Sequence, residues 1–165
     1  MPEKPIKRNE NLITLSKDHH FGLLFCWKIR QGLKAEIELD RIRKYINYFW
    51  EFHLKQHFIE EETILFNQVK DRLCEDGFNQ HKEIRNLITR LKVSTKEDET
   101  AYALLASLVD KHIRFEERIL FPYLESVLPV EKLAYIGTQL KKIHVAPKAD
   151  IYPDEFWIKI NKINI

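Results

Sequence analysis

The chain has 165 residues, of which 44% are hydrophobic and 12% aromatic, and its 27 basic and 25 acidic residues give a formal net charge of +2. This length suits one well-packed domain, and the hydrophobic content is typical of a globular protein and excludes extensive disorder. The charges are nearly balanced and interspersed, so electrostatics provide no basis for binding nucleic acid or an anionic membrane.

Targeting signals are not evident in the sequence. No stretch approaches the roughly 18 apolar residues that span a bilayer, and the opening "MPEKPIKRNE" lacks the apolar region of a secretory signal. Cys26 and Cys74 match no metal-binding or redox spacing, and each lies in an apolar helical pattern. They are expected to be buried free thiols in a reducing compartment. We therefore expect a cytoplasmic protein.

Apolar residues recur every three or four positions rather than every second one, which predicts helices and no strand. Gly32 is expected to loosen the end of the first helix, and Gly77 is expected to break the chain before the third. Ser94 and Glu97 stand at capping-box spacing in a predicted turn. The first two predicted helices cover about residues 12–34 and 40–70. The third follows the break at Gly77 and ends at about residue 92, and the fourth covers about 96–127. A shorter fifth helix covers about 129–144, with Pro129 in its first turn.

Four main helices with short connections predict an all-α fold: an up-down-up-down four-helix bundle with a short additional C-terminal helix and tail. The bundle is expected over residues 11–145, after an N-terminal extension over residues 1–10. The tail, residues 146–165, is expected to pack outside the bundle through Phe156 and Trp157. Contact of this tail with another subunit is the alternative.

Two stretches share one pattern, "HFIEEETILF" at 57–66 and "HIRFEERILF" at 112–121. A helix advances about 100° per residue, so the first glutamate of each stretch follows its histidine by one turn and shares its face. The next glutamate lies about 140° away and is expected to face solvent or a neighbouring helix. The inward pairs are thus His57 with Glu61 and His112 with Glu116, and the outer glutamates are Glu62 and Glu117.

The same helical geometry predicts which residues surround these pairs in the interior. On a regular helix, the side chains named next point within about 40° of the direction of His57 or His112. The residues near His57 are Ile46, Trp50, His53 and Ile64, and those near His112 are Leu105, Leu108, Ile119 and Tyr123.

Two further histidines are expected to point inward. His19 lies at the centre of the apolar stripe of the first helix, whereas His20 lies about 100° away. His19 is therefore the better candidate, with His20 as the alternative. His81 shares its side of the third helix with Cys74 and Ile84.

A lone inward histidine is more often a core residue than a ligand, and a glutamate run is usually solvated. Here, however, four helices each present an inward histidine and two add an inward carboxylate. Burying two carboxylates without compensation costs several kcal/mol each, and no inward lysine or arginine pairs with them. Imidazole and carboxylate without thiolate suit iron, manganese or zinc. The set exceeds one tetrahedral zinc site and suffices for two metals bridged by Glu61 and Glu116.

The sequence resembles hemerythrin-like domains of the HHE cation-binding type. The resemblance rests on "LSKDHH", "HFIEEETILF", "NQHKEI" and "HIRFEERILFP" and covers about residues 11–128. It implies a four-helix bundle with a non-haem di-iron centre. The ligands that it implies are His19, His57, Glu61, His81, His112 and Glu116, with the two glutamates bridging.

One feature departs from the family pattern. Hemerythrins that carry oxygen reversibly have a fifth histidine one turn before the position of His81, where this chain has Gly77. His53 or a water molecule is expected to take the place of that ligand. Glu60 and Tyr123 are expected to lie beside the ligands and orient them.

These features together predict a protein that holds two non-haem iron ions, as Fe2+ or Fe3+. An oxo or hydroxo group is one option for a bridge between them, and zinc or manganese are less favoured metals. It is expected to bind O₂ or a related ligand such as NO, for sensing, storage or iron handling. A di-iron enzyme with peroxidase, oxidase or repair activity, a mononuclear or zinc site, and a metal-free structural bundle are the alternatives. The sequence does not identify a protein partner.

Overall fold

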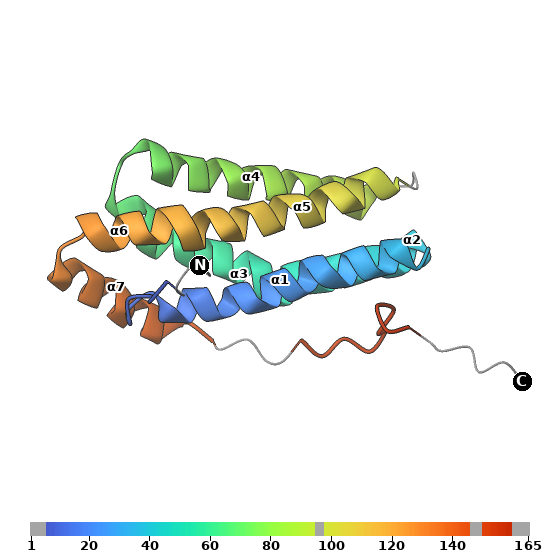
Figure 1. Cartoon of the computed structure of the whole chain (residues 1–165), viewed down its shortest axis with the longest axis horizontal. Helices are drawn as coiled ribbons and strands as arrows, with labels where there is room; N and C mark the ends of the chain where they lie inside the picture. Colours follow the sequence, from blue (N-terminus) through green and yellow to red (C-terminus); the bar gives the residue numbers. More distant parts are fainter. Residues whose placement is uncertain (1–5, 95–97, 146–149, 160–165) are drawn as a thin grey trace, which may run out of the picture.

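The computed structural model describes residues 6–94, 98–145 and 150–159. These residues form helices and no β-strand, and the long helices lie side by side along a common direction (Figure 1). No helix in this part of the chain combines the length and apolar character needed to cross a bilayer. The α-helices are α1 (Ile13–Lys34), α2 (Leu39–Phe49), α3 (Lys55–Glu60), α4 (Arg72–Val93), α5 (Glu99–Phe115), α6 (Phe121–Val127) and α7 (Val130–Ile143).

Several of these helices are joined into longer rods by short segments of other helical type. The π-helical segments η1 (Trp50–Leu54) and η2 (Glu61–Leu65), with the 3₁₀ turn η3 (Phe66–Gln68), extend α2 and α3 into one rod. The π-helical segment η4 (Glu116–Leu120) joins α5 to α6. The rods match the predicted helices at 40–70 and 96–127, although the second begins at Glu99, where the Asp98 side chain caps it by accepting from the Thr100 N–H.

The predicted break at Gly77 is wrong. Helix α4 begins at Arg72, where the Asp71 side chain accepts a hydrogen bond from the Cys74 N–H at 3.1 Å and caps the helix. Gly77 lies inside the helix and is buried. A Cβ atom there would lie 3.0 Å from the Phe66 ring, so the glycine permits close packing rather than a turn. Of the predicted capping box, Glu97 lies outside the described residues.

The described part of the C-terminal tail packs against α1. Phe156 is 3% exposed, and a Cβ atom at Gly32 would lie 2.8 Å from its ring. Gly32 lies inside α1, near its last residue Lys34, and makes room for Phe156. The Lys28 ammonium lies 4.0 Å from the Trp157 ring and 2.6 Å from an Asp150 carboxylate oxygen. The predicted packing through Phe156 and Trp157 is thus confirmed; residues 146–149 and 160–165 lie outside the described residues.

The π-helical segments rotate the side chains that follow them. A π-turn accommodates one extra residue, so the inward positions move on by one. At the end of η4 and beyond it, Leu120 and Leu124 are fully buried, whereas Ile119 is 50% exposed and Tyr123 is partly buried. The expectation that Ile119 and Tyr123 share the inward face of His112 is wrong for this reason.

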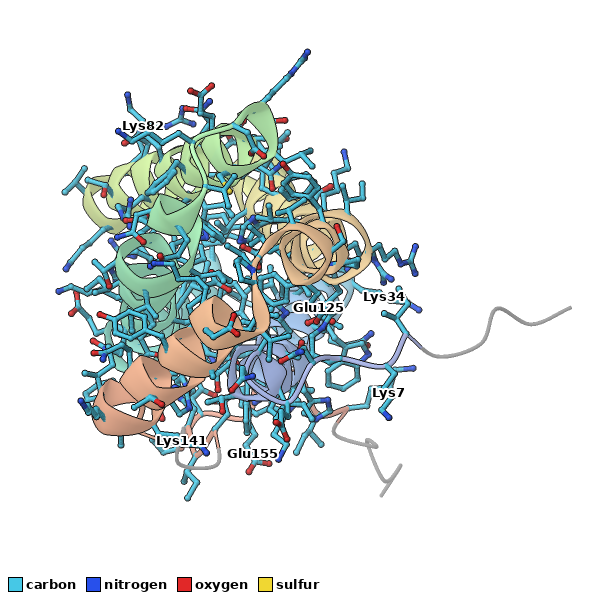
Figure 2. All side chains as sticks on the ribbon, turned by 90° about the vertical axis from the view of Figure 1, so that its left-hand side faces the viewer. Lys7, Lys34, Lys82, Glu125, Lys141 and Glu155 are labelled. Atoms are coloured by element: carbon cyan, nitrogen blue, oxygen red, sulfur yellow. The ribbon has the colours of Figure 1, made fainter. Side chains whose placement is uncertain are left out.

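A layer of polar side chains separates two hydrophobic clusters in the interior. One cluster contains Phe25 and Ile113, and the other contains Leu15 and Leu120. On α1 and α4, His19 and His81 lie in sequence between residues of the two clusters, and on the other two rods Glu61 and Glu116 do so. In the end-on view, charged side chains such as Lys82 and Lys141 lie at the periphery (Figure 2). The polar layer is therefore enclosed between two apolar halves.

Candidate metal centre

Six of the side chains predicted as metal ligands meet in this layer. Each is at most 6% exposed, and each candidate ligand atom lies within 4.8 Å of the others in its group. His20, the alternative to His19, is exposed and belongs to neither group. The first group is His19, His57, Glu61 and Glu116, and the second is Glu61, His81, His112 and Glu116.

The Glu61 carboxylate faces both groups. Its Oε1 atom lies 2.9 Å from His57 Nε2, and its Oε2 atom lies 3.2 Å from His81 Nε2. The two histidines come from α3 and α4, so this one carboxylate spans the gap between two helices. One oxygen is thus available to each group.

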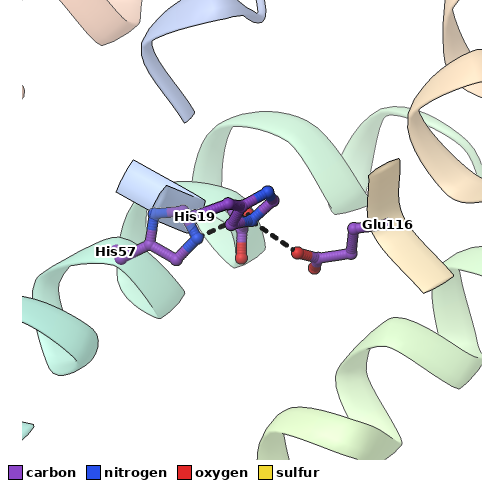
Figure 3. Close-up of side chains that lie close together, drawn as sticks. His19, His57 and Glu116 are labelled. Atoms are coloured by element: carbon purple, nitrogen blue, oxygen red, sulfur yellow. Dashed lines mark ion pairs between the residues drawn. The ribbon is translucent and has the colours of Figure 1, made fainter. Parts of the chain in front are cut away.

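The Glu116 carboxylate has the same arrangement. Its Oε1 atom lies 3.0 Å from His112 Nε2, and its Oε2 atom lies 2.9 Å from His19 Nε2. Figure 3 shows His19 between His57 and Glu116, with a dashed line on the His19–Glu116 pair. Each group therefore offers two imidazole nitrogens and one oxygen from each carboxylate.

Most of these donor atoms have no hydrogen-bond partner within the described residues. Both oxygens of Glu61 and Glu116 and the Nε2 atoms of His19 and His57 are buried and unsatisfied. Unsatisfied buried polar groups are costly and uncommon in folded proteins. An ion that binds nitrogen and oxygen at about 2.1 Å places neighbouring ligand atoms about 3 Å apart. The donor separations of 2.9–3.2 Å therefore fit a metal ion.

The Nδ1 atom of every histidine in the two groups is held by a side chain from another helix. Three of these partners are carboxylates and one is an amide. The bonds join His19 to Glu117 at 2.6 Å, His57 to Asp18 at 3.1 Å, His81 to Glu62 at 2.9 Å and His112 to Gln80 at 2.9 Å.

These bonds fix the tautomer of each ring. A carboxylate oxygen only accepts, as does the Gln80 amide oxygen that faces His112, so Nδ1–H donates to it and the neutral imidazole presents the Nε2 lone pair to the interior. His81 Nε2 and His112 Nε2 lie 3.0 Å apart, so when both rings are neutral in this tautomer their lone pairs face each other and repel. A cation between the donors removes this repulsion. The two groups can therefore hold a metal ion with their imidazole rings already oriented toward it.

Comparison with known protein families agrees with this geometry. The family model described as the hemerythrin HHE cation-binding domain matches residues 14–124 and, in an overlapping match, residues 78–146. The chain belongs to the hemerythrin HHE cation-binding family. Searches of curated proteins and of solved structures gave no match. The family and the buried donor groups together indicate a protein that binds a cation.

The two halves of this hemerythrin-family site are related by a repeated pattern of contacts. The second glutamate of each motif binds the lone histidine of another helix, as Glu117 binds His19. The residue before each lone histidine binds a motif histidine, as Asp18 binds His57. The sequence had predicted only that Glu117 faces solvent or a neighbouring helix. Its pairing with α1, and the role of Asp18, were missed, although the repeated "EE" was a visible signal.

Without a metal, protons compensate the buried carboxylates of this hemerythrin-family centre. Burial alone would lower the pKa of His81, but a proton on Nε2 faces Glu116 and Glu61 while Nδ1 bonds Glu62, and these contacts outweigh burial and raise the pKa to about 10. The pKa of Glu61 is held well below its ordinary value, because the charge of protonated His57 and the protonated imidazoles of His19 and His81 that face its oxygens outweigh burial. Metal ions and protons therefore compete for the same donors.

Three further predicted contributors to the site lie elsewhere. The Tyr123 hydroxyl donates to Asp71, so it does not orient a ligand. Glu60 accepts a hydrogen bond from His144 Nδ1 at 2.8 Å instead of contacting the two groups. His53 belongs to neither group and stacks on Phe49 with ring centroids 4.9 Å apart. No fifth histidine joins the two groups within the described chain.

The N-terminal extension contributes to the surroundings of the centre, which the sequence did not predict. Arg8 Nη2 donates to a Glu117 carboxylate oxygen at 2.9 Å, and Nη1 donates to Glu125 at 2.9 Å. The Arg8 side chain is 6% exposed. Arg85 similarly pairs with Glu62 at 2.9 Å. Each glutamate that holds a lone histidine thus also pairs with an arginine.

Arg8→Ala should lower the free energy of unfolding by about 2 kcal/mol, because it leaves partly buried Glu117 and Glu125 without their cation. It should also weaken metal binding about tenfold by loosening the Glu117–His19 bond. Denaturant unfolding and metal titration measure the two effects. The matched control is exposed Lys7→Ala, which should change the unfolding free energy by less than about 0.5 kcal/mol. Equal effects of the two changes would contradict the role of Arg8.

Proposed function

We propose that this hemerythrin-family protein holds two non-haem iron ions and binds O₂ or a related small ligand such as NO. The observation that carries the proposal is the pair of buried, unsatisfied carboxylates, each offering one oxygen to each of two histidine groups. Bound iron would supply the reversible redox chemistry that such ligands require. Iron is proposed over zinc because two adjoining nitrogen–oxygen groups suit a dinuclear redox centre.

His19 and His57 would hold one ion, His81 and His112 the other, and Glu61 and Glu116 would bridge them. Four protein donors per ion are fewer than the six of octahedral coordination. Positions therefore remain for a small exogenous ligand. The absence of a fifth histidine from the two groups favours sensing, storage or iron handling over simple oxygen transport.

Aromatic rings would restrict water around the bound ligand. The Phe58 ring stacks on His81 with centroids 3.7 Å apart, and Phe121 stacks on His19 at 5.5 Å. Leu105 is fully buried, and Ile64 is 8% exposed. These apolar neighbours would keep competing water from the centre, and the fixed Nδ1 hydrogen bonds would hold the imidazoles in place.

We also propose that the helices form an up-down-up-down four-helix bundle with α7 added at one end. The packing of α5 against both α1 and α4, with short connections between helices, supports this order. A cytoplasmic location is proposed as well. The free, buried thiols of Cys26 and Cys74 support it, because such thiols are usual in reducing compartments.

Anaerobic titration of metal-free protein with Fe2+ tests the proposed function. We expect about two ions per chain and, on exposure to oxygen, new near-ultraviolet and visible absorption from an oxo-bridged diferric centre. His57→Ala should halve the metal content or abolish it, because it removes one of the two imidazoles of the first group. Binding of fewer than about two ions by the unchanged protein, or an unaltered spectrum under oxygen and NO, would contradict the proposal.

A further inference from the structure

The two halves of the candidate metal centre differ at one of the contacts that orient their ligands. Asp18 on α1 accepts a hydrogen bond from His57 Nδ1 at 3.1 Å. At the equivalent position of α4 the residue is Gln80, and its amide oxygen accepts from His112 Nδ1 at 2.9 Å. A neutral amide thus stands in one half where the other half has a carboxylate.

The remaining contacts of the two halves match in chemical type. His19 and His81 each donate from Nδ1 to a glutamate, and each of these glutamates also pairs with an arginine. Glu61 and Glu116 each offer one oxygen to each group. Among the Nδ1 contacts of the described residues, the partner of the motif histidine is therefore where the halves differ in charge.

The charge of this partner affects how strongly an imidazole binds a cation. A carboxylate that accepts from Nδ1–H makes the ring a better donor at Nε2, and a neutral amide oxygen does so less. The difference counts more where water is excluded, and the His57 and His112 side chains are 7% and 2% exposed. The Asp18 oxygen that faces His144, at 3.6 Å, is Oδ1, so Oδ2 is left to His57. His57 is thus the stronger donor.

The amide also holds the ligand tautomer of His112 less strongly than a carboxylate would. The amide oxygen of Gln80 accepts from Nδ1–H, but a half-turn of the amide presents its NH₂ group, which donates. The ring proton then lies on Nε2, where Glu116 Oε1, 3.0 Å away, can accept it. In that tautomer Nε2 has no lone pair for a metal ion. Asp18 offers His57 no such alternative, because a carboxylate only accepts.

We propose that the two ion positions are unequal and that Gln80 sets the difference. The group with His19 and His57 takes the first ion, and the group with His81 and His112 takes the second about tenfold less tightly, since one of its ligands lacks a charged partner. When metal is scarce, the first position stays filled and the second empties. Gln80 is a positioning residue, because it acts through His112. The inference rests on the proposed function in requiring two ions per chain.

Titration of metal-free protein with Co2+ under argon tests this inference, because Co2+ binds nitrogen and oxygen donors and oxygen chemistry is absent. We expect two steps, followed by visible absorption and calorimetry. Gln80→Glu places a carboxylate beside His112, so it should tighten the second step about fivefold and change the first by about twofold or less. Asp18→Asn should weaken the first step about fivefold and change the second by about twofold or less.

Exposed Asn79 provides the matched control. Asn79→Asp adds a negative charge beside Gln80 in the sequence but on a side chain that belongs to neither ligand group. It should change each step by less than about twofold, because the charge is exposed and screened by solvent. A tighter second step in Gln80→Glu is a gain that a disturbed fold does not produce, and circular dichroism should show every variant folded.

The outcomes separate this inference from the proposed function. If Gln80→Glu leaves the second Co2+ step unchanged, or Asp18→Asn weakens the second step and not the first, the inference is overturned, even when iron and oxygen give the expected spectrum. If the Co2+ steps respond as expected but iron-loaded protein gives no signal with oxygen or NO, the proposed function fails and the unequal positions stand.

Discussion

Glu61→Gln should abolish binding of both metal ions, reducing the metal content from about two per chain to nearly zero. The reason is geometric, because one Glu61 oxygen belongs to each group and the carboxylate lies between His57 and His81. An amide can offer only one oxygen and no negative charge. Changes outside the ligand set typically cost 10- to 100-fold in metal affinity, so loss of a shared ligand should cost at least about 100-fold at both positions. Elemental analysis after dialysis against metal-free buffer measures the result.

The neighbouring glutamates provide matched controls for this change. Glu60 is 1% exposed, as buried as Glu61, but it bonds His144. Glu60→Gln should therefore leave the metal content unchanged. Glu62→Gln keeps an acceptor for His81 Nδ1 but loses the charge, and it should weaken binding of one ion about tenfold. If Glu60→Gln, Glu61→Gln and Glu62→Gln all remove metal equally, the three glutamates stabilise the fold and Glu61 is not a specific metal ligand.

Much of the fold follows from the sequence because burial of an apolar stripe determines the helices. Periodicity located the long helices, and it placed His19 inward and His20 outward, as the structure has them. The error at Gly77 has a simple cause: glycine was interpreted as a helix end. Its lack of a Cβ atom instead serves close packing with Phe66, and this contact depends on a residue from another rod.

The π-turns limited the prediction of the site. A uniform rotation of about 100° per residue cannot represent an extra residue in one turn. The local sequence around Glu116 does not show that the backbone hydrogen bonds change there. His112, before the π-turn, was therefore oriented correctly, whereas Ile119 within it and Tyr123 after it were not.

The groups that orient the ligands could not be found from one helix at a time. Glu117 and His19 are 98 residues apart in the sequence, and Arg8 and Glu117 are 109 apart. A side chain on the flank of one helix bonds to a neighbouring helix, and the packing of the helices determines which neighbour that is. The ligand candidates were easier to find because burial of a carboxylate is itself anomalous, whereas a glutamate on a flank is not.

Removing the metal ions with a chelator should lower the free energy of unfolding by several kcal/mol. An ion present at a thousand times its dissociation constant stabilises the folded state by about 4 kcal/mol, and the two ions act together. For a protein of this length the melting temperature should fall by on the order of 20 °C. Scanning calorimetry with and without chelator measures the change, and Glu61→Gln, expected to be metal-free already, should show none.

The stability of the metal-free protein should depend on pH in a defined direction. The raised pKa values, about 9 for His57 and about 10 for His81 against 6.5 ordinarily, mean that the folded state retains protons that the unfolded state has lost. This stabilisation is fully present below pH 6.5 and is lost as the pH rises through 9 to 10. The lowered pKa of Glu61 stabilises above its ordinary 4.5 and is lost only in acid.

The difference in melting temperature between metal-loaded and metal-free protein should therefore grow from pH 6.5 to pH 9. Metal ions replace the protons of His57 and His81, so loaded protein does not lose these interactions as the solution becomes alkaline. Melting both forms at half-unit steps of pH measures the difference. If metal-free protein becomes more stable over this range, protons do not compensate Glu61 and Glu116, and the buried carboxylates must have another partner.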